Sequence, residues 1–75
     1  MSANQLALAL RVPANRITGI LRGERSITPE TALRLGRFLG TGAPFWMNLQ
    51  TAHDLSLIEA ELGQRIEEEV SSPSR

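Results

Sequence analysis

The sequence predicts an all-α fold of four helices, the last of them extended, and three observations predict it. Apolar residues recur at helical spacing through most of the chain. Pro and Gly interrupt that spacing at intervals that suit short connections. Strand-like alternation is confined to one Leu-Ala run over residues 6–10. Because the chain has 75 residues and no cysteine, we expect one small domain of marginal stability that binds a partner.

The first two helices are short and lie close together in the chain. Ser2 and Gln5 form a capping-box pattern, which predicts a first helix over about 2–10. Pro13 holds Val12 out of helical dihedrals and suits the first turn of a second helix, expected over about 13–22 and ended by Gly23. Only a tight turn therefore separates the two helices.

A third helix is expected between Thr28 and Gly40. Thr28 caps it, Pro29 suits its first position, and Gly40 ends it. Its apolar stripe, at spacing i, i+3, i+4, i+7, consists of Ala32, Leu35, Gly36 and Leu39.

A long fourth helix is expected over about 44–70, and the pattern allows a bend or break at Leu55-Ser56 or at Gly63. The positions that keep helical spacing are Trp46, Leu49, His53, Leu57, Ile58, Leu62 and Ile66. Residues 71–75 have nothing to bury, which predicts a disordered tail after a domain of residues 1–70.

The charged residues divide the chain into a basic and an acidic half, although the formal net charge is zero. Residues 1–37 contain six arginines and two glutamates, for a net charge of +4. Residues 38–75 contain two arginines and six acidic residues, for a net charge of −4. One half can therefore face an anion while the other cannot. All eight cations are arginine, which suits contact with phosphate or guanine but agrees equally well with a GC-rich coding bias.

The second predicted helix has one packing face and one polar face. Ile17, Ile20 and Leu21 lie within about 100° of arc and are expected to pack. The opposite side carries Asn15, Thr18, Gly19 and Arg22, with Arg16 on its flank. Two short helices and a tight turn, here residues 2–22, are typical of a helix-turn-helix unit, whose second helix enters the DNA major groove. A solvated helix face carries the same residue types, so the pattern alone leaves both interpretations open.

The polar face has the chemistry that base recognition requires. Asn can pair with adenine, Arg with guanine, and a Thr methyl group can contact the thymine methyl group. Gly19 costs about 1 kcal/mol relative to Ala inside a helix. We expect it to allow a close approach of the helix backbone to the bases or to a neighbouring helix.

Four segments spread over residues 2–55 resemble one family. They are Ser2-Ala3-Asn4-Gln5-Leu6-Ala7, Val12-Pro13-Ala14-Asn15-Arg16-Ile17, Ile27-Thr28-Pro29-Glu30-Thr31-Ala32-Leu33-Arg34-Leu35 and Phe45-Trp46-Met47-Asn48-Leu49-Gln50. Together they resemble the HigA/VapI-type antitoxins of the Xre (Cro/C1-type) helix-turn-helix family. The resemblance implies a lambda-repressor-like bundle in which Ala7 lies where the first two helices cross and Val12, Ile17 and Ile20 close the core.

The resemblance also implies a function. Such a protein is a sequence-specific repressor and antitoxin that binds double-stranded operator DNA as a homodimer, autoregulates its operon and pairs with a HigB-like (RelE-type) ribonuclease toxin. The residues implied to read the bases are Ala14, Asn15, Arg16, Thr18 and Gly19. Those implied to lie near the phosphates are Ser2, Asn4, Gln5, Arg22, Arg25 and Ser26. Phosphate contacts should make the affinity fall steeply with salt.

Two features depart from the family pattern. The broader family often has Gly at the turn position that Arg11 occupies. Its members also usually carry another helix and an extended arm before the position of Ser2, so we expect a shortened form in which Leu6, Leu10 and Leu35 lose part of their cover. Such a form motivates an alternative function, an interaction module that pairs with a toxin or a paralogue without reading DNA.

The fourth predicted helix carries candidates for a dimer or partner interface. They are Phe45, Trp46, Leu49, His53 and Leu57. Apolar clusters of this kind more often form the core, and the two roles are compatible where a core crosses a dimer axis. We expect His53 to be a partly packed helix residue. Five glutamates over residues 59–69 surround an apolar stripe and suit either a solvated helix end or a docking segment for a basic toxin.

The residue inventory argues against enzyme, metal and membrane functions. The chain has no Cys, Tyr or Lys, only one His and no Gly-rich phosphate loop, so we expect no catalytic constellation, metal site or cofactor. The longest apolar run, residues 6–10, is too short for a membrane span or a signal-peptide core. The sequence thus predicts a cytoplasmic protein that is not an enzyme.

Overall fold

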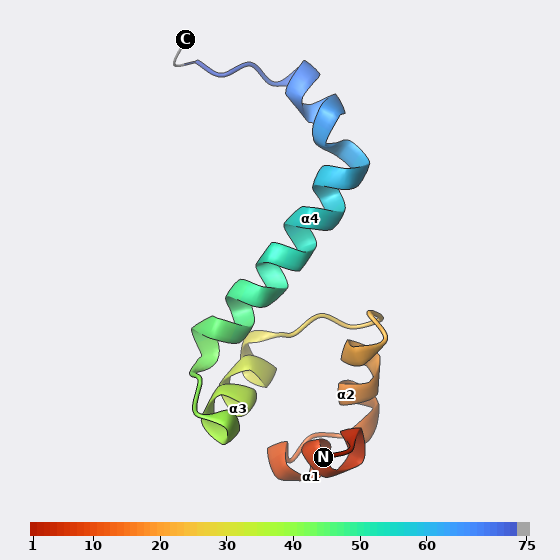
Figure 1. Cartoon of the computed structure of the whole chain (residues 1–75), viewed down its shortest axis with the longest axis vertical. Helices are drawn as coiled ribbons and strands as arrows, with labels where there is room; N and C mark the ends of the chain where they lie inside the picture. Colours follow the sequence, from red (N-terminus) through yellow and green to blue (C-terminus); the bar gives the residue numbers. More distant parts are fainter. Residues whose placement is uncertain (74–75) are drawn as a thin grey trace.

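The structure, a computed structural model, describes residues 1–73 and contains four helices over that range. They are α1 (Ala3–Leu10), α2 (Ala14–Leu21), α3 (Pro29–Leu39) and α4 (Ala43–Glu69). Figure 1 shows that α1, α2 and α3 gather at one end, while α4 extends away from this body. The molecule accordingly measures 51 × 22 × 17 Å. Residues 1–73 contain no strand, and the predicted all-α class is confirmed.

α1 begins as the capping box predicts. The Ser2 hydroxyl accepts a hydrogen bond from the Gln5 N–H (3.2 Å), and Gln5 Oε1 accepts one from the Ser2 N–H (2.8 Å). The helix ends at Arg11, whose φ of 59° lies in the left-handed region and whose N–H donates to the Leu8 carbonyl. This conformation costs an L-residue about 1–2 kcal/mol, which is the physical reason that glycine suits this turn position.

α2 begins one residue later than predicted. Pro13 is its N-cap, in extended conformation (φ −61°, ψ 144°), and not a residue of its first turn. Ile17 is buried and Ile20 packs against the core, as predicted. The prediction that Leu21 packs is wrong, because Leu21 is 72% exposed. α2 packs closely against α1 alone among the helices, so no helix within residues 1–73 covers Leu21 at its end.

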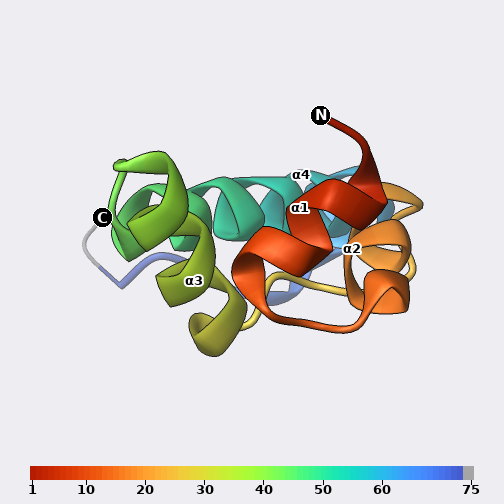
Figure 2. The same ribbon diagram turned by 90° about the horizontal axis from the view of Figure 1, so that it is seen from below.

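The core is small and lies around α3. Its buried apolar residues are Ala7, Leu10, Ile17, Ile27, Ala32 and Leu35. α3 packs against both α1 and α4, and Figure 2 shows α1 between α2 and α3 with α4 behind them. Leu10 and Leu35 are buried, so the expectation that they lose part of their cover is wrong, whereas Leu6 is only partly buried. Leu39, predicted as part of the apolar stripe, is half exposed because α3 ends there.

The connection from α3 to α4 lies directly against α3. Thr28 caps α3 as predicted. At Gly36, a Cβ atom would lie 2.4 Å from the Gly42 carbonyl carbon and 2.6 Å from the Ala43 nitrogen. The Gly36 carbonyl also accepts a hydrogen bond from the Gly42 N–H (3.3 Å). Only glycine leaves room for this approach, which fixes where α4 starts.

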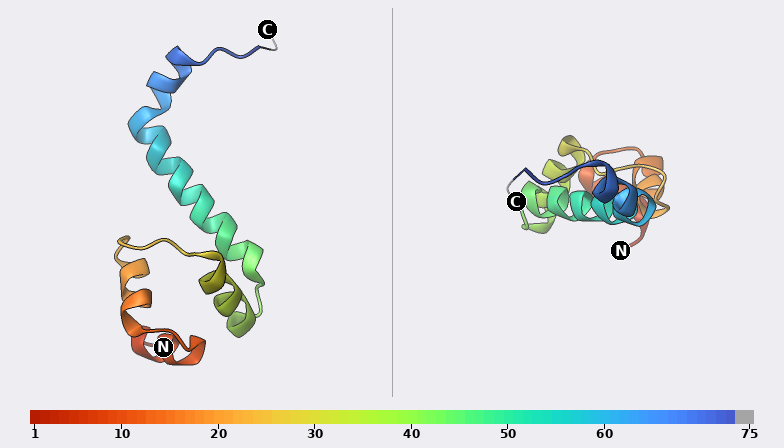
Figure 3. Two further views of the ribbon diagram at one scale, coloured as in Figure 1. Left: turned by 180° about the vertical axis from the view of Figure 1, so that it is seen from behind. Right: turned by 90° about the horizontal axis from the view of Figure 1, so that it is seen from above.

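α4 is one uninterrupted helix, so neither of the two allowed breaks occurs, but its distal part bends away from the direction of its first turns (Figure 1). Its partly buried residues within the first two turns are Ala43, Trp46, Met47 and Gln50. Phe45, Leu49 and Leu57 are about half exposed, and His53 is exposed. The interpretation as packed core is wrong in the single chain for Phe45, Leu49 and Leu57, because α4 contacts the body over its first turns and then leaves it (Figure 3). The expectation that His53 is partly packed is wrong for the same reason. Trp46 does pack against the core.

The chain leaves the helical conformation after Glu69, and residues 70–73 are exposed. The last two residues of the predicted tail, 74 and 75, lie outside the described residues. No helix within residues 1–73 combines the length and hydropathy that crossing a membrane requires.

Replacing Gly36 by alanine tests the packing of the α3–α4 connection. We expect Gly36→Ala to lower the free energy of unfolding by about 1–3 kcal/mol, because the new Cβ must displace backbone. Gly63→Ala is the matched control, since its Cβ would meet Glu59 Cβ at an ordinary 3.8 Å and alanine favours a helix by about 1 kcal/mol. Urea unfolding followed by circular dichroism measures both variants. Equal changes in the two would contradict the packing assigned to Gly36.

Candidate nucleic-acid interface

The first turn of α2 presents two of the predicted base-reading residues. Ala14 and Asn15 are both exposed. Asn4 of α1, predicted to lie near a phosphate, lines the same shallow depression as Ala14. An exposed asparagine amide offers one acceptor and two donors, which suit the major-groove edge of adenine. The start of α2 therefore brings a candidate base contact and a candidate phosphate contact together.

Thr18 lies one turn further along α2 and is half-buried. Its hydroxyl donates within the helix to the carbonyls of Ala14 (3.4 Å) and Asn15 (3.3 Å). Because the hydroxyl proton is used inside α2, the methyl group is the part of Thr18 that suits a contact with a thymine methyl group.

Gly19 is buried although it lies on the polar side of α2. A Cβ atom there would lie 2.7 Å from both Cγ and Cδ of Arg25, so the Arg25 side chain covers this position. The Gly19 carbonyl also accepts hydrogen bonds from the N–H groups of Glu24 (2.8 Å) and Arg25 (3.1 Å). The expectation that Gly19 clears space for bases or for a neighbouring helix is thus corrected, because Arg25 occupies that space.

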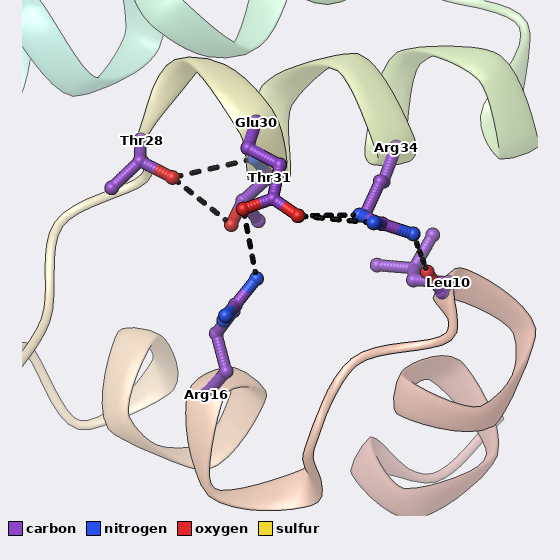
Figure 4. Close-up of polar contacts among 6 residues, drawn as sticks. All are labelled: Leu10, Arg16, Thr28, Glu30, Thr31 and Arg34. Carbon is purple, nitrogen blue, oxygen red and sulfur yellow. Dashed lines mark hydrogen bonds and ion pairs between the residues drawn. The ribbon is translucent and has the colours of Figure 1, made fainter.

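Arg16 extends from α2 toward α3 (Figure 4). Its Nη1 lies 3.6 Å from Oε1 of Glu30, and its side chain is 29% exposed. The other oxygen of Glu30 accepts hydrogen bonds from Nε (3.1 Å) and Nη2 (3.0 Å) of Arg34. Arg34 Nη1 donates in turn to the Leu10 carbonyl (3.0 Å). One carboxylate therefore links α2 to α3 and, through Arg34, to the end of α1.

The N-terminus of α1 holds three of the residues predicted to lie near phosphates, Ser2, Asn4 and Gln5, and all three are exposed. Ser2 and Gln5 form the capping box, which gives their own backbone N–H groups partners. The N–H groups of the two residues between them have no partner inside the helix. Such a helix end favours an anion through these N–H groups and through the helix dipole.

The other three predicted phosphate residues follow α2. Arg25 and Ser26 line one polar depression together with Arg16. Arg22 and Arg25 are exposed, and neither forms an ion pair within residues 1–73. Exposed cationic side chains therefore follow directly after α2 in the chain.

The predicted interface residues of α4 do not form one cluster. Leu49 and His53 line a groove between α4 and the end of α2, where they meet Leu21. The rings of Phe45 and Trp46 instead contact each other edge to face, with centroids 5.0 Å apart. Leu57 belongs neither to that groove nor to the ring pair, and it is half exposed further along α4. The exposed apolar surface of α4 is thus extended along the helix.

Three residues for which the sequence predicts no role hold this region together. Glu30 and Arg34 form the ion pair described above, and their i, i+4 spacing on a predicted helix was a signal for it. Gln50 Oε1 accepts a hydrogen bond from the Ile27 N–H (2.8 Å), which ties the segment after α2 to α4. No sequence pattern marks this last contact, because it joins a side chain to a backbone group 23 residues away.

The arrangement of two short helices, a tight turn and a third packing helix is that of a known family. A family model described as helix-turn-helix matches residues 1–46. The chain belongs to the helix-turn-helix family. The match covers α1, α2, α3 and the start of α4, and the Xre-type family that the resemblance implied is thereby confirmed.

Known helix-turn-helix proteins share both sequence and fold with this chain. Virulence-associated protein I of Dichelobacter nodosus is 49% identical over 61 residues, which are 81% of this chain and 56% of that protein. An addiction module antidote protein of the HigA family from Coxiella burnetii has 54% identity and a TM-score of 0.93, over 96% of this chain and 78% of that one. The Pseudomonas aeruginosa antitoxin HigA, solved with the higBA promoter, has 42% identity and a TM-score of 0.89, over 99% and 79%. The chain spans little more than half the length of its curated relative.

Proposed function

We propose that this helix-turn-helix protein is a sequence-specific DNA-binding repressor that acts as the antitoxin of a toxin-antitoxin pair and autoregulates its operon. The observation that supports this most directly is the exposed first turn of α2, flanked by arginines and by the N-terminus of α1. A HigA antitoxin with the same fold has been solved with its promoter. In this assignment residues 1–70 form the domain, with α4 as its dimerisation and partner helix.

DNA recognition follows from the placement of the side chains. With the first turn of α2 in the major groove, Asn15 reaches an adenine edge and the Thr18 methyl group contacts thymine. Arg16 reaches a guanine from the flank. The N-terminus of α1 and the exposed Arg22 and Arg25 contact phosphates on either side, which fixes the register of α2 on the duplex.

A homodimer accounts for the apolar surface that α4 leaves exposed. Leu21 and Leu49 line a groove that nothing fills within residues 1–73, and Phe45 and Leu57 are half exposed nearby on α4. Exposed apolar side chains that lie along one helix beside such a groove suit an interaction site. A two-fold dimer places two copies of α2 at two half-sites of a palindromic operator.

A HigB-like (RelE-type) ribonuclease is the proposed toxin partner. The distal half of α4 is exposed and carries five glutamates, of which only Glu69 forms an ion pair within residues 1–73. This acidic surface suits a basic protein that binds RNA.

The experiment that tests the proposed function compares two duplexes at two salt concentrations. Fluorescence anisotropy measures the affinity of the chain for the DNA upstream of its own gene and for a shuffled duplex, at about 50 and 200 mM salt. We expect preferential binding to the upstream DNA, and weaker binding to both at the higher salt. Equally weak binding to both duplexes by a folded chain would contradict repression and favour an interaction module that does not read DNA.

Substitution of the base-reading residues should remove sequence preference. We expect Asn15→Ala and Arg16→Ala each to lower the preference for the upstream DNA by about 1–3 kcal/mol, because each removes one base contact. Arg37→Ala is the control, since it removes the same charge from an exposed position on α3. The measurement is the ratio of the two dissociation constants. An unchanged ratio in both Asn15→Ala and Arg16→Ala would rule out α2 as the recognition helix.

Substitution beneath the Arg25 side chain should weaken phosphate contact. We expect Gly19→Ala to displace Arg25 and therefore to reduce affinity for both duplexes, with a salt slope shallower by up to about one unit. Arg25→Ala should have the same effect in full. Gly63→Ala, far along α4, serves as the control. A loss confined to the upstream DNA would contradict the phosphate role of Arg25.

Charge introduced into the α2–α4 groove should separate the dimer. We expect Leu49→Glu to raise the dimer dissociation constant at least tenfold, about 1.4 kcal/mol, because it buries an unpaired carboxylate. Leu33→Glu places the same charge at an exposed leucine of α3 outside the groove. Sedimentation equilibrium measures both variants. Dissociation caused by Leu33→Glu and not by Leu49→Glu would place the dimer interface elsewhere.

A further inference from the structure

We propose that Glu30 is a positioning residue for DNA recognition. Its carboxylate, fixed by Arg34, holds Arg16 beside the base-reading face of α2 and keeps it from phosphates on unrelated DNA. The inference rests on the proposed function and adds to it a specificity-determining residue that lies outside the recognition helix.

The Glu30 carboxylate is held in place by contacts that do not involve Arg16. Two nitrogens of Arg34 donate to its Oε2 at 3.1 and 3.0 Å, and the third nitrogen of the same guanidinium is tied to the Leu10 carbonyl at 3.0 Å (Figure 4). Both ends of this link are therefore anchored to helices, α3 at one end and α1 at the other. The remaining oxygen, Oε1, lies 3.6 Å from Nη1 of Arg16.

The Arg16–Glu30 pair connects two helices that otherwise approach each other little. α2 packs closely against α1, and α3 packs against α1 and α4, but α2 and α3 have no close helix-to-helix packing within residues 1–73. Arg16 is thus restrained by a charge on a neighbouring element and not by its own helix. A fixed carboxylate gives the long arginine side chain a preferred direction.

A restrained arginine discriminates better between sequences than a free one. Phosphates are present at every site and carry no sequence information, so an unrestrained guanidinium near the duplex strengthens binding to any DNA. The Glu30 carboxylate competes for Arg16 and repels phosphates. On the operator, a guanine edge at the end of the positioned side chain accepts hydrogen bonds from the Arg16 guanidinium in place of Glu30.

The Arg16–Glu30 ion pair is weak enough for Arg16 to leave Glu30 and bind a guanine. The separation of 3.6 Å is longer than a hydrogen bond, and the two side chains are 29% and 58% exposed. Exposed ion pairs of this kind shift an equilibrium by up to about fivefold. Glu30 can therefore set the preference of Arg16 without trapping it.

The neighbouring Arg25 lies in the same depression but is not held by a carboxylate. It lines that depression with Arg16 and Glu30, yet it forms no ion pair within residues 1–73 and lies across Gly19. The two arginines thus differ in restraint, which agrees with a base contact for Arg16 and a phosphate contact for Arg25.

The test is a double-mutant cycle on sequence preference. Glu30→Gln keeps an oxygen that accepts hydrogen bonds from Arg34 and removes the charge that holds Arg16. We expect it to strengthen binding to the shuffled duplex by about three- to fivefold, to leave operator affinity equal or lower, and to lower the melting temperature only slightly, because it weakens the exposed Glu30–Arg34 pair. Glu24→Gln removes the same charge from an exposed position and should change both affinities by the same factor. In an Arg16→Gln background, Glu30→Gln should no longer alter the ratio of the two affinities.

Each result bears on the proposal. A ratio unchanged in Glu30→Gln, or changed equally by Glu24→Gln, would overturn it. So would a change in ratio that persists when Arg16 is already Gln, because Glu30 would then act through another group. If the unaltered chain itself shows no preference for the upstream duplex, the proposed function fails and this inference fails with it, whereas a preference that Glu30→Gln leaves intact removes the inference alone.

Discussion

The close contact of α3 with its neighbours is the constraint on which the rest of the structure depends. α3 is the element within residues 1–73 that packs against both α1 and α4. On α3, Ala32 is completely buried. At Gly36 the backbone of the α3–α4 connection lies directly against the helix. Small residues at both places let the helix axes and the connection approach closely. A chain of this size has little apolar area to bury, so these contacts decide where every other element lies.

Polar contacts complete the connections that so small a core leaves open. Arg34 joins α3 to the Leu10 carbonyl at the end of α1, and Gln50 joins α4 to the Ile27 N–H after α2. Each of these bonds satisfies a backbone group that would otherwise lose a partner at a helix end or in a loop. The arginines of the basic half therefore have different roles. Arg34 is structural, Arg16 is restrained, and Arg22 and Arg25 remain exposed, so the net charge of +4 over residues 1–37 overstates what is available to an anion.

Local features of the fold could be predicted from the sequence, and contacts between distant residues could not. The Ser2 and Thr28 caps and the burial of Ile17 all follow from patterns within a few residues. Leu21 has the same helical phase as a core residue but lies at the end of α2, where packing depends on how far α4 is from it. Gly19 is buried because the chain returns after α2 and places Arg25 over it, and a helical wheel contains no information about that return. Periodicity shows which face of a helix can pack, whereas the tertiary arrangement decides whether a neighbour is present.

The groove between α2 and α4 connects the proposed dimer interface to the proposed recognition helix. Leu21, at its edge, is the last residue of α2, and Leu49 lies opposite on α4. Gln50, which also lines the groove, holds the Ile27 N–H and so fixes the segment that carries Arg25 and Ser26 toward α3. A second copy seated in the groove therefore contacts the end of the helix that reads the bases and the segment that follows it. Under the proposed function, dimerisation orders the surface that binds DNA, and DNA binding strengthens the dimer to the same extent, because the two equilibria share these residues and are thermodynamically linked.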